Sequence, residues 1–208
     1  MSVGSSIEWT ENTWVVTTGC TEVSSGCAQC YARGMSKRLA AMAEADVRRG
    51  RDPGKKGAYR LSVVPETGKW SGVVTPLESA LDEPLHWKKP RRIFVNSMSD
   101  LFWGTERDLA EARRRGVKDP QPVPFEFIDK VFAVMALCPQ HTFQVLTKRP
   151  ERMAEYLADL EWVRSRAAYR AEESDWKGAG WGVVYNEDWP LANVWLGASC
   201  EDQPTADE

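Results

Sequence analysis

The sequence has neither a long apolar run nor a recognisable leader. Its longest uninterrupted apolar stretch, residues 131–138, is far shorter than the roughly 18 to 20 residues that span a bilayer. Residues 1–11 lack both the basic start and the apolar segment of a secretory signal. We therefore expect a cytoplasmic protein without membrane association. A chain of 208 residues with 42% hydrophobic residues is too apolar for a disordered protein and suits a single domain over residues 1–208.

A strong net charge is also absent, because 27 Lys and Arg residues face 30 Asp and Glu residues. This balance argues against a dedicated non-specific DNA coat. The charges are unevenly placed: residues 33–118 hold 19 basic and 11 acidic residues, whereas residues 186–208 hold six acids and no base. The pattern fits two solvated faces of opposite sign, or a basic surface that meets a phosphate-bearing partner such as nucleic acid.

The chain has five cysteines, and an odd number in a chain without a secretion signal argues against a disulfide framework. Cys20, Cys27 and Cys30 fall within eleven residues, which indicates a metal or redox role. Cys138 ends an apolar helical run and Cys200 ends a strand-like run. We interpret both as small buried residues.

Short apolar and β-branched runs predict four strands. They cover residues 14–18, 92–98, 142–148 and 193–199. Runs that are apolar throughout are typical of strands buried in a parallel sheet. Helical patterns follow the first three strands, over residues 31–49, 125–135 and 151–160. The repeated order of strand, loop and helix predicts an α/β fold with a parallel sheet and right-handed crossovers.

Three insertions interrupt this order, at about residues 50–72, 104–123 and 164–189. They are too long for simple connections, so we expect lids, small subdomains or loops. Residues 203–208 resemble the start of a fourth helix, at which the chain stops. The sequence thus predicts an open half-barrel, truncated after the fourth strand, that works alone or is completed by a partner chain.

Polar residues follow each predicted strand. The cysteine loop, residues 18–31, follows the first; the others are followed by residues 96–100, by residues 147–149, and by Ser199 with Glu201 and Asp202. Parallel sheets carry their chemistry at the carboxyl ends of their strands. We therefore expect an active-site rim there.

The cysteine spacing leaves several chemistries open. Structural zinc takes four protein ligands, so a fourth would have to come from His86, His141, Cys138 or Cys200. A 4Fe–4S cluster held by three cysteines keeps one iron open for another ligand. The helix predicted after Cys30 favours anionic thiolates at its N-terminus. Iron–sulfur, zinc and unligated redox thiols all remain compatible with the spacing.

Longer motifs resemble a known family. They are Ile7-Glu8-Trp9-Thr10, Thr18-Gly19-Cys20-Thr21, Gly26-Cys27, Cys30-Tyr31-Ala32-Arg33, Asp82-Glu83-Pro84-Leu85, the run from Pro90 to Phe102, Phe143 to Pro150, and Asn193-Val194-Trp195-Leu196-Gly197. Together they resemble an uncharacterised, phage-associated three-cysteine family related to radical SAM enzymes. The resemblance covers nearly the whole chain.

The resemblance implies a partial TIM-type (β/α) barrel with a 4Fe–4S cluster bound by Cys20, Cys27 and Cys30. It implies reductive cleavage of S-adenosylmethionine, with electrons from a reducing donor, and hydrogen abstraction from an unknown substrate in a bacterial host cell. The basic middle of the chain favours nucleic acid as that substrate. The alternative is a non-enzymatic zinc-binding or nucleic-acid-binding phage protein that uses the same cysteines.

The resemblance also suggests roles for polar residues at the strand ends. Asp100 and Lys148 are the predicted catalytic residues. The predicted cofactor-binding residues are Tyr31, Asn96, Ser97, Ser99 and Arg149. Simpler interpretations stand beside these: Asp100 caps the following turn, Lys148 and Arg149 form a solvated pair, and Tyr31 packs in the core.

Overall fold

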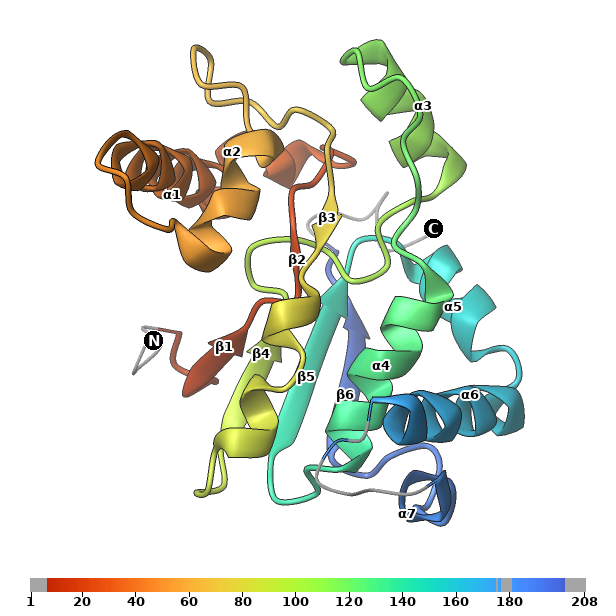
Figure 1. The fold of residues 1–208 in the computed structure, drawn as a ribbon. Coiled ribbons are helices and arrows are strands. Elements are labelled where there is room, and N and C mark those ends of the chain that lie inside the picture. The colour runs from red at the N-terminus through yellow and green to blue at the C-terminus, as the bar shows by residue number, and fades with distance from the viewer. Residues whose placement is uncertain (1–6, 175, 177–180, 201–208) are drawn as a thin grey trace.

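The structure is a computed structural model and describes residues 7–174, 176 and 181–200. At its centre lies a four-stranded parallel sheet (Figure 1). The strand order is β1 (Asn12–Trp14), β4 (Arg92–Val95), β5 (Thr142–Thr147) and β6 (Val194–Ala198). The predicted α/β fold with a parallel sheet is therefore confirmed.

The first predicted strand is divided into two. After β1 the chain leaves the main sheet, and β2 (Thr17–Thr18) pairs antiparallel with β3 (Thr75–Pro76). Asn96 causes this departure, because its side-chain Oδ1 accepts the backbone N–H groups of Val16 (2.8 Å) and Thr17 (3.1 Å). The Val16 N–H thus bonds the Asn96 side chain and not the backbone of the neighbouring strand.

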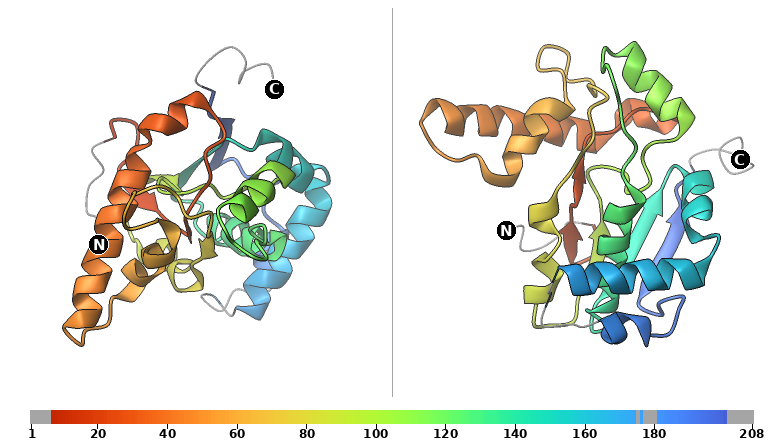
Figure 2. Two further views of the ribbon diagram at one scale, coloured as in Figure 1. Left: turned by 90° about the horizontal axis from the view of Figure 1, so that it is seen from above. Right: turned by 45° about the vertical axis from the view of Figure 1, so that its right-hand side comes forward.

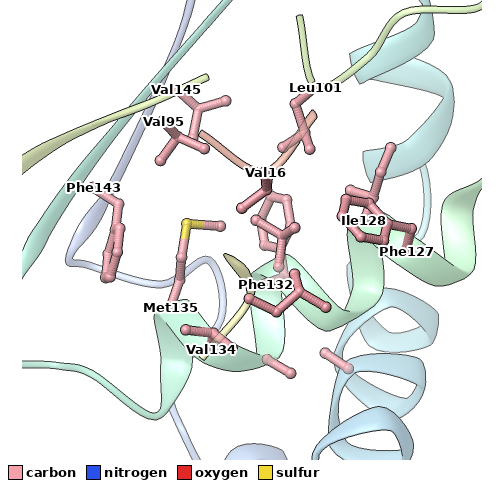
Figure 3. Packing of buried hydrophobic residues seen from close by; sticks show 14 of the residues in the cluster. Val16, Val95, Leu101, Phe127, Ile128, Phe132, Val134, Met135, Phe143 and Val145 are labelled. Carbon is pink, nitrogen blue, oxygen red and sulfur yellow. The ribbon is translucent and has the colours of Figure 1, made fainter. Parts of the chain in front are cut away.

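Helices α4 (Phe125–Ala136), α5 (Pro150–Leu157) and α6 (Leu160–Glu173) pack beside the sheet (Figure 1). Phe143, Val95 and Val145 of the sheet meet Met135 and Ile128 of α4 in the main core (Figure 3). Helix α6 contributes buried small residues to the same core, and α7 (Trp181–Tyr185) packs against it. The insertion predicted at residues 164–189 therefore starts inside this helical layer and is not a simple lid.

A second unit lies beyond the carboxyl ends of the strands (Figure 1, Figure 2). It contains α1 (Tyr31–Arg48) and α2 (Tyr59–Ser62), linked by the 3₁₀ helix η2 (Gly54–Ala58). Its own apolar cluster is built around Tyr59, Trp70 and Met98. Two further 3₁₀ turns, η3 (Glu78–Ala80) and η4 (Glu83–His86), precede β4.

The insertion predicted at residues 104–123 contains a helix, α3 (Glu106–Arg114). Thr105 and Asp108 form a capping box, in which each side chain bonds the other residue's backbone N–H. Such a box stabilises the first turn of a helix by satisfying N–H groups that have no partner inside it. The proline-containing residues that follow α3 lead back to α4.

The described strands form an open sheet, and the predicted partial TIM-type barrel is not confirmed. Glu201, Asp202 and the helix start predicted at residues 203–208 lie outside the described residues. In the described part of the chain, no helix combines the length and apolar character needed to cross a membrane.

Candidate cysteine site at the strand ends

Cys20, Cys27 and Cys30 line one cavity of about 220 Å³ at the carboxyl ends of β4 and β5. The structure brings all ten predicted catalytic, cofactor-binding and metal-binding residues to this cavity. Its walls include Tyr31, Asn96, Ser97, Ser99, Asp100, Lys148 and Arg149. Sequence reasoning did not single out Trp70, Met98, Phe94 and Leu146, which supply its apolar walls. Phe94, Met98 and Leu146 lie within the family motifs but were assigned no role there, and Trp70 lies in the insertion at residues 50–72.

The cysteine loop holds its thiols in different settings. Cys27 is buried within the short 3₁₀ helix η1 (Ser25–Gln29), and its Sγ lies 3.4 Å from Ser24 Oγ. Cys30 is the N-cap of α1 and makes no side-chain capping bond. Tyr31 and Ala32 of the first turn line the cavity with it. Cys20 packs between the main core and the second apolar cluster.

Cys20 and Cys27 differ in their pKa. Burial raises the pKa of Cys20 to about 12, and the nearby positive charge of Arg149 offsets only part of this effect. Burial also raises the pKa of Cys27, but hydrogen bonds with Ser24 and nearby backbone groups and the charge of Lys148 outweigh it, so the net pKa is lowered. Cys27 is thus the thiol that ionises more easily.

The thiols are not gathered around a single point. No group of three or more Cys, His, Asp or Glu side chains among residues 7–174, 176 and 181–200 is arranged to hold a metal ion. The chemistry of the donor set nevertheless fits a thiophilic metal group, because three cysteines of one loop line one cavity beside a helix N-terminus.

The other two cysteines and the two histidines differ in how deeply they are buried. Cys138 is buried in the main core, as predicted. His141 is buried with its Nε2 near the Pro84 carbonyl oxygen, and His86 has a largely exposed side chain. Cys200 was predicted to be buried and is exposed, because it follows the edge strand β6. It lines a small neighbouring cavity with Ser24 and Lys148.

One protein family matches the chain. The match is to DUF5131, described as a protein of unknown function, and it covers residues 4–208. This chain belongs to the DUF5131 family. The predicted membership of an uncharacterised family is thereby confirmed, whereas the radical SAM relationship and the phage association are not shown. Comparison with curated proteins gives no match, and neither does comparison with solved structures.

In this DUF5131 protein, Asp100 is buried and accepts four hydrogen bonds. Its donors are Thr147 Oγ1 (2.7 Å), Arg149 (3.2 Å) and the backbone N–H groups of Phe102 and Lys148 (both 2.9 Å). The simpler interpretation of Asp100 as a turn cap is confirmed by its bond to Phe102. Its catalytic role stays a prediction.

Lys148 and Arg149 of the DUF5131 chain are not a solvated pair. Lys148 is half-buried, and its Nζ donates to Ser24 Oγ (3.2 Å) beside Cys27. Arg149 is 1% exposed, and all three guanidinium nitrogens donate to protein oxygens. The predicted binding of a cofactor by Arg149 stays a prediction.

The remaining predicted residues of the DUF5131 site are held by hydrogen bonds to backbone and side-chain groups. Asn96 has a positive φ of 57°, a conformation that asparagine tolerates well, and its side chain is engaged with Val16 and Thr17. Ser99 Oγ donates to the Thr17 carbonyl oxygen, and Tyr31 Oη donates to that of Ser97 (2.6 Å). Tyr31 is 59% exposed, so it is not the core residue of the simpler interpretation.

Proposed function

We propose that this protein is an iron–sulfur protein of the radical SAM type, in which Cys20, Cys27 and Cys30 hold a 4Fe–4S cluster. The observation that carries the proposal is the cavity that these three cysteines share at the carboxyl ends of the strands. A parallel sheet places its reactive groups at this edge. Three thiolates leave one iron of such a cluster without a protein ligand.

The surroundings of the thiols favour an anionic group. The N-terminus of the 18-residue helix α1 lies at the cavity, and its first turn contains no acidic residue. Partial positive charge at a helix N-terminus stabilises an anion there. Lys148 adds a full positive charge beside Cys27.

When bound, the cluster would supply the electron that cleaves S-adenosylmethionine and so starts hydrogen abstraction from the substrate. The chain's own residues position the reactants. Trp70 and Met98 are buried along the cavity and would exclude water from it. Asp100 and Lys148 are the residues we propose to act in catalysis, and Tyr31, Ser97 and Ser99 would contact the cofactor.

The size of the cavity indicates where the cofactor would extend. Its volume of about 220 Å³ is below the roughly 300–1,000 Å³ typical of sites that enclose a drug-sized ligand. Phe94 and Leu146 line the cavity and also belong to the sheet face opposite α4. Leu146 is 38% exposed, so the adenosyl group would lie across this open face. A nucleic-acid substrate, an electron donor and a partner chain that completes a barrel belong to the same proposal.

A zinc site is the second candidate, and Cys200 is the observation that favours it. Cys200 lies at the carboxyl end of β6, beside Ser24 of the cysteine loop. With Cys20, Cys27 and Cys30 it would complete the four thiolates that structural zinc prefers. In that case the protein would be a non-enzymatic binding protein.

Metal analysis of anaerobically purified protein separates the two candidates. We expect about four irons and four sulfides per chain, because three cysteines suffice for a cluster with one open iron. Replacing Cys20, Cys27 and Cys30 together by Ala should abolish both. Cys138→Ala is the matched control, since this cysteine is buried in the main core away from the cavity. It should keep the full iron content.

One zinc per chain without sulfide would contradict the radical SAM proposal. Loss of that zinc in Cys200→Ala would establish the second candidate. If iron and sulfide are present, the next assay is reductive cleavage of S-adenosylmethionine.

A further inference from the structure

A buried ion-pair network lies directly behind the cysteine loop. Its centre is Arg149, whose Nη2 lies 2.7 Å from Asp108 Oδ1 and whose Nη1 lies 3.2 Å from Asp100 Oδ2. Arg149 Nε also donates to Asp108 Oδ2 (3.0 Å). Asp108 is 0% exposed. The arginine therefore forms a two-point contact with one buried carboxylate and a single contact with another, the geometry that gives charge-assisted bonds their strength.

The network reaches the cysteine loop through Thr21, the residue after Cys20. The Thr21 hydroxyl donates to Asp108 Oδ1 and accepts from Trp103 Nε1 (3.0 Å) and from Arg149 (3.2 Å). The Thr21 carbonyl oxygen accepts from Arg149 (3.0 Å) and from Cys20 Sγ (3.3 Å). Both the side chain and the backbone of Thr21 are thus fixed.

Three elements meet at this point. Asp108 belongs to α3, Asp100 follows β4, and Arg149 follows β5. The network contacts the start of the cysteine loop directly at Thr21. A second link to the loop runs through Lys148, whose backbone N–H donates to Asp100 and whose Nζ donates to Ser24. The Cys20 end of the loop is therefore anchored to the sheet and to α3.

We propose that Asp108 and Arg149 are positioning residues, which hold Thr21 and thereby fix Cys20 at the cavity wall. The functional meaning of this role, an ordered ligand for the cluster, rests on the proposed function. The positioning itself does not, because it concerns the protein without metal.

Thiol labelling of the metal-free protein tests the positioning. The probe is iodoacetamide, and fragment ions in mass spectrometry assign the label to each cysteine. Asp108→Asn and Thr21→Val should raise the labelling rate of Cys20 about tenfold, because lost buried hydrogen bonds make local opening easier. Thr21→Val leaves every charge in place, so a faster rate in this variant cannot come from an altered charge near the thiol. Thr21→Ser restores the hydroxyl and should label like the wild type.

Asp129→Asn is the matched control. Asp129 is equally buried and pairs with Arg166 (3.0 Å), but it lies on α4 in the helical layer. This variant should leave the Cys20 rate unchanged, and Cys138 should label slowly in every variant. An unchanged Cys20 rate in both Asp108→Asn and Thr21→Val would overturn the proposal. So would equal acceleration of Cys20 and Cys138, which indicates general loosening.

A second readout concerns the loaded protein. If the wild type binds a cluster, Thr21→Val should lose its visible absorption in air several-fold faster than Thr21→Ser. Equal loss rates would contradict positioning of the ligand. If the wild type binds no iron, the proposed function fails, while the labelling result still decides whether Asp108 and Arg149 position Cys20. If Asp108→Asn does not fold, the Thr21 variants alone decide the question.

Discussion

At the scale of single residues, Asp108 shows how a buried charge is kept ionised. Burial by itself raises the pKa of this carboxyl, but the hydrogen bonds and positive charge of Arg149 outweigh it and lower the pKa to about 2. Thr21 and the Gly104 backbone add further hydrogen bonds. If the Asp108 carboxylate were lost, the buried Arg149 would keep a single contact with one carboxylate, that of Asp100, and an incompletely paired buried charge is costly.

This lowered pKa predicts a pH dependence of stability. The pKa of Asp108 in the folded protein lies below the value of about 3.9 expected in the unfolded chain. The ionised carboxylate therefore stabilises the fold fully above about pH 5, and this contribution is lost as the pH falls from about 4 towards 2. The free energy of unfolding of the wild type should exceed that of Asp108→Asn at neutral pH. Between pH 6 and pH 2 the difference should shrink by on the order of 2 kcal/mol.

Urea unfolding at a series of pH values measures this difference directly. A gap between the two proteins that stays constant from pH 6 to pH 2 would mean that the Asp108 carboxyl is not held ionised by Arg149.

At the scale of elements, Gly19 allows the cysteine loop to leave β2. It has a φ of +88°, and a Cβ atom built there would lie 2.0 Å from the Val73 carbonyl oxygen. Only glycine fits both the backbone conformation and the close approach of the segment before β3. Gly19 also forms a parallel bridge with Ser99, which aligns the start of the loop with the end of β4.

Gly19→Ala should therefore lower the free energy of unfolding by at least about 2 kcal/mol. It should also reduce metal binding by the loop, because Cys20 is the next residue. Gly34→Ala is the control: this glycine lies in α1, and a Cβ there meets nothing within 4 Å. Alanine at that position should stabilise the helix by up to about 1 kcal/mol. Thermal unfolding of the two variants checks both signs, and equal stability of the pair would refute the argument.

At the scale of the whole molecule, the two faces of the sheet differ. One face is covered by α4 and carries Val95, Phe143 and Val145 in the core. The other presents Phe94, Leu146 and Trp195, of which Trp195 is 57% exposed. Trp9 packs edge-on against Phe94 with a centroid distance of 4.9 Å and is itself 40% exposed. Gln144 lies on the same face between Phe94 and Trp195. Large exposed apolar side chains grouped on one face mark an interaction or ligand-binding site.

This surface predicts self-association of the purified chain. The weight-average sedimentation coefficient of the wild type should rise with protein concentration, and Trp195→Ser should reduce that rise. Leu61→Ser is the control, because Leu61 is 62% exposed on α2 and does not belong to the sheet face. If Trp195→Ser and Leu61→Ser behave alike, the exposed sheet face does not drive association.

Local sequence pattern was enough to predict the parallel strands, the helix α4 after Pro124 and the cysteine loop. Each of these is encoded by neighbouring residues: an apolar run, a 3.6-residue period or a cluster of thiols. All ten predicted site residues lie at one cavity, as the strand pattern predicted, because the carboxyl ends of parallel strands share one edge of the sheet.

Contacts between distant segments of the chain decided the features that the sequence did not predict. The first predicted strand divides because Asn96, about 80 residues away, takes two of its N–H groups. Asp108 lies in an insertion for which the sequence left a lid, a small subdomain or a loop open, and its link to Thr21 spans 87 residues. Cys200 is exposed because β6 is an edge strand, which its apolar sequence does not reveal. Hydrogen bonds and burial of this kind depend on the neighbours that folding supplies, so no local pattern records them.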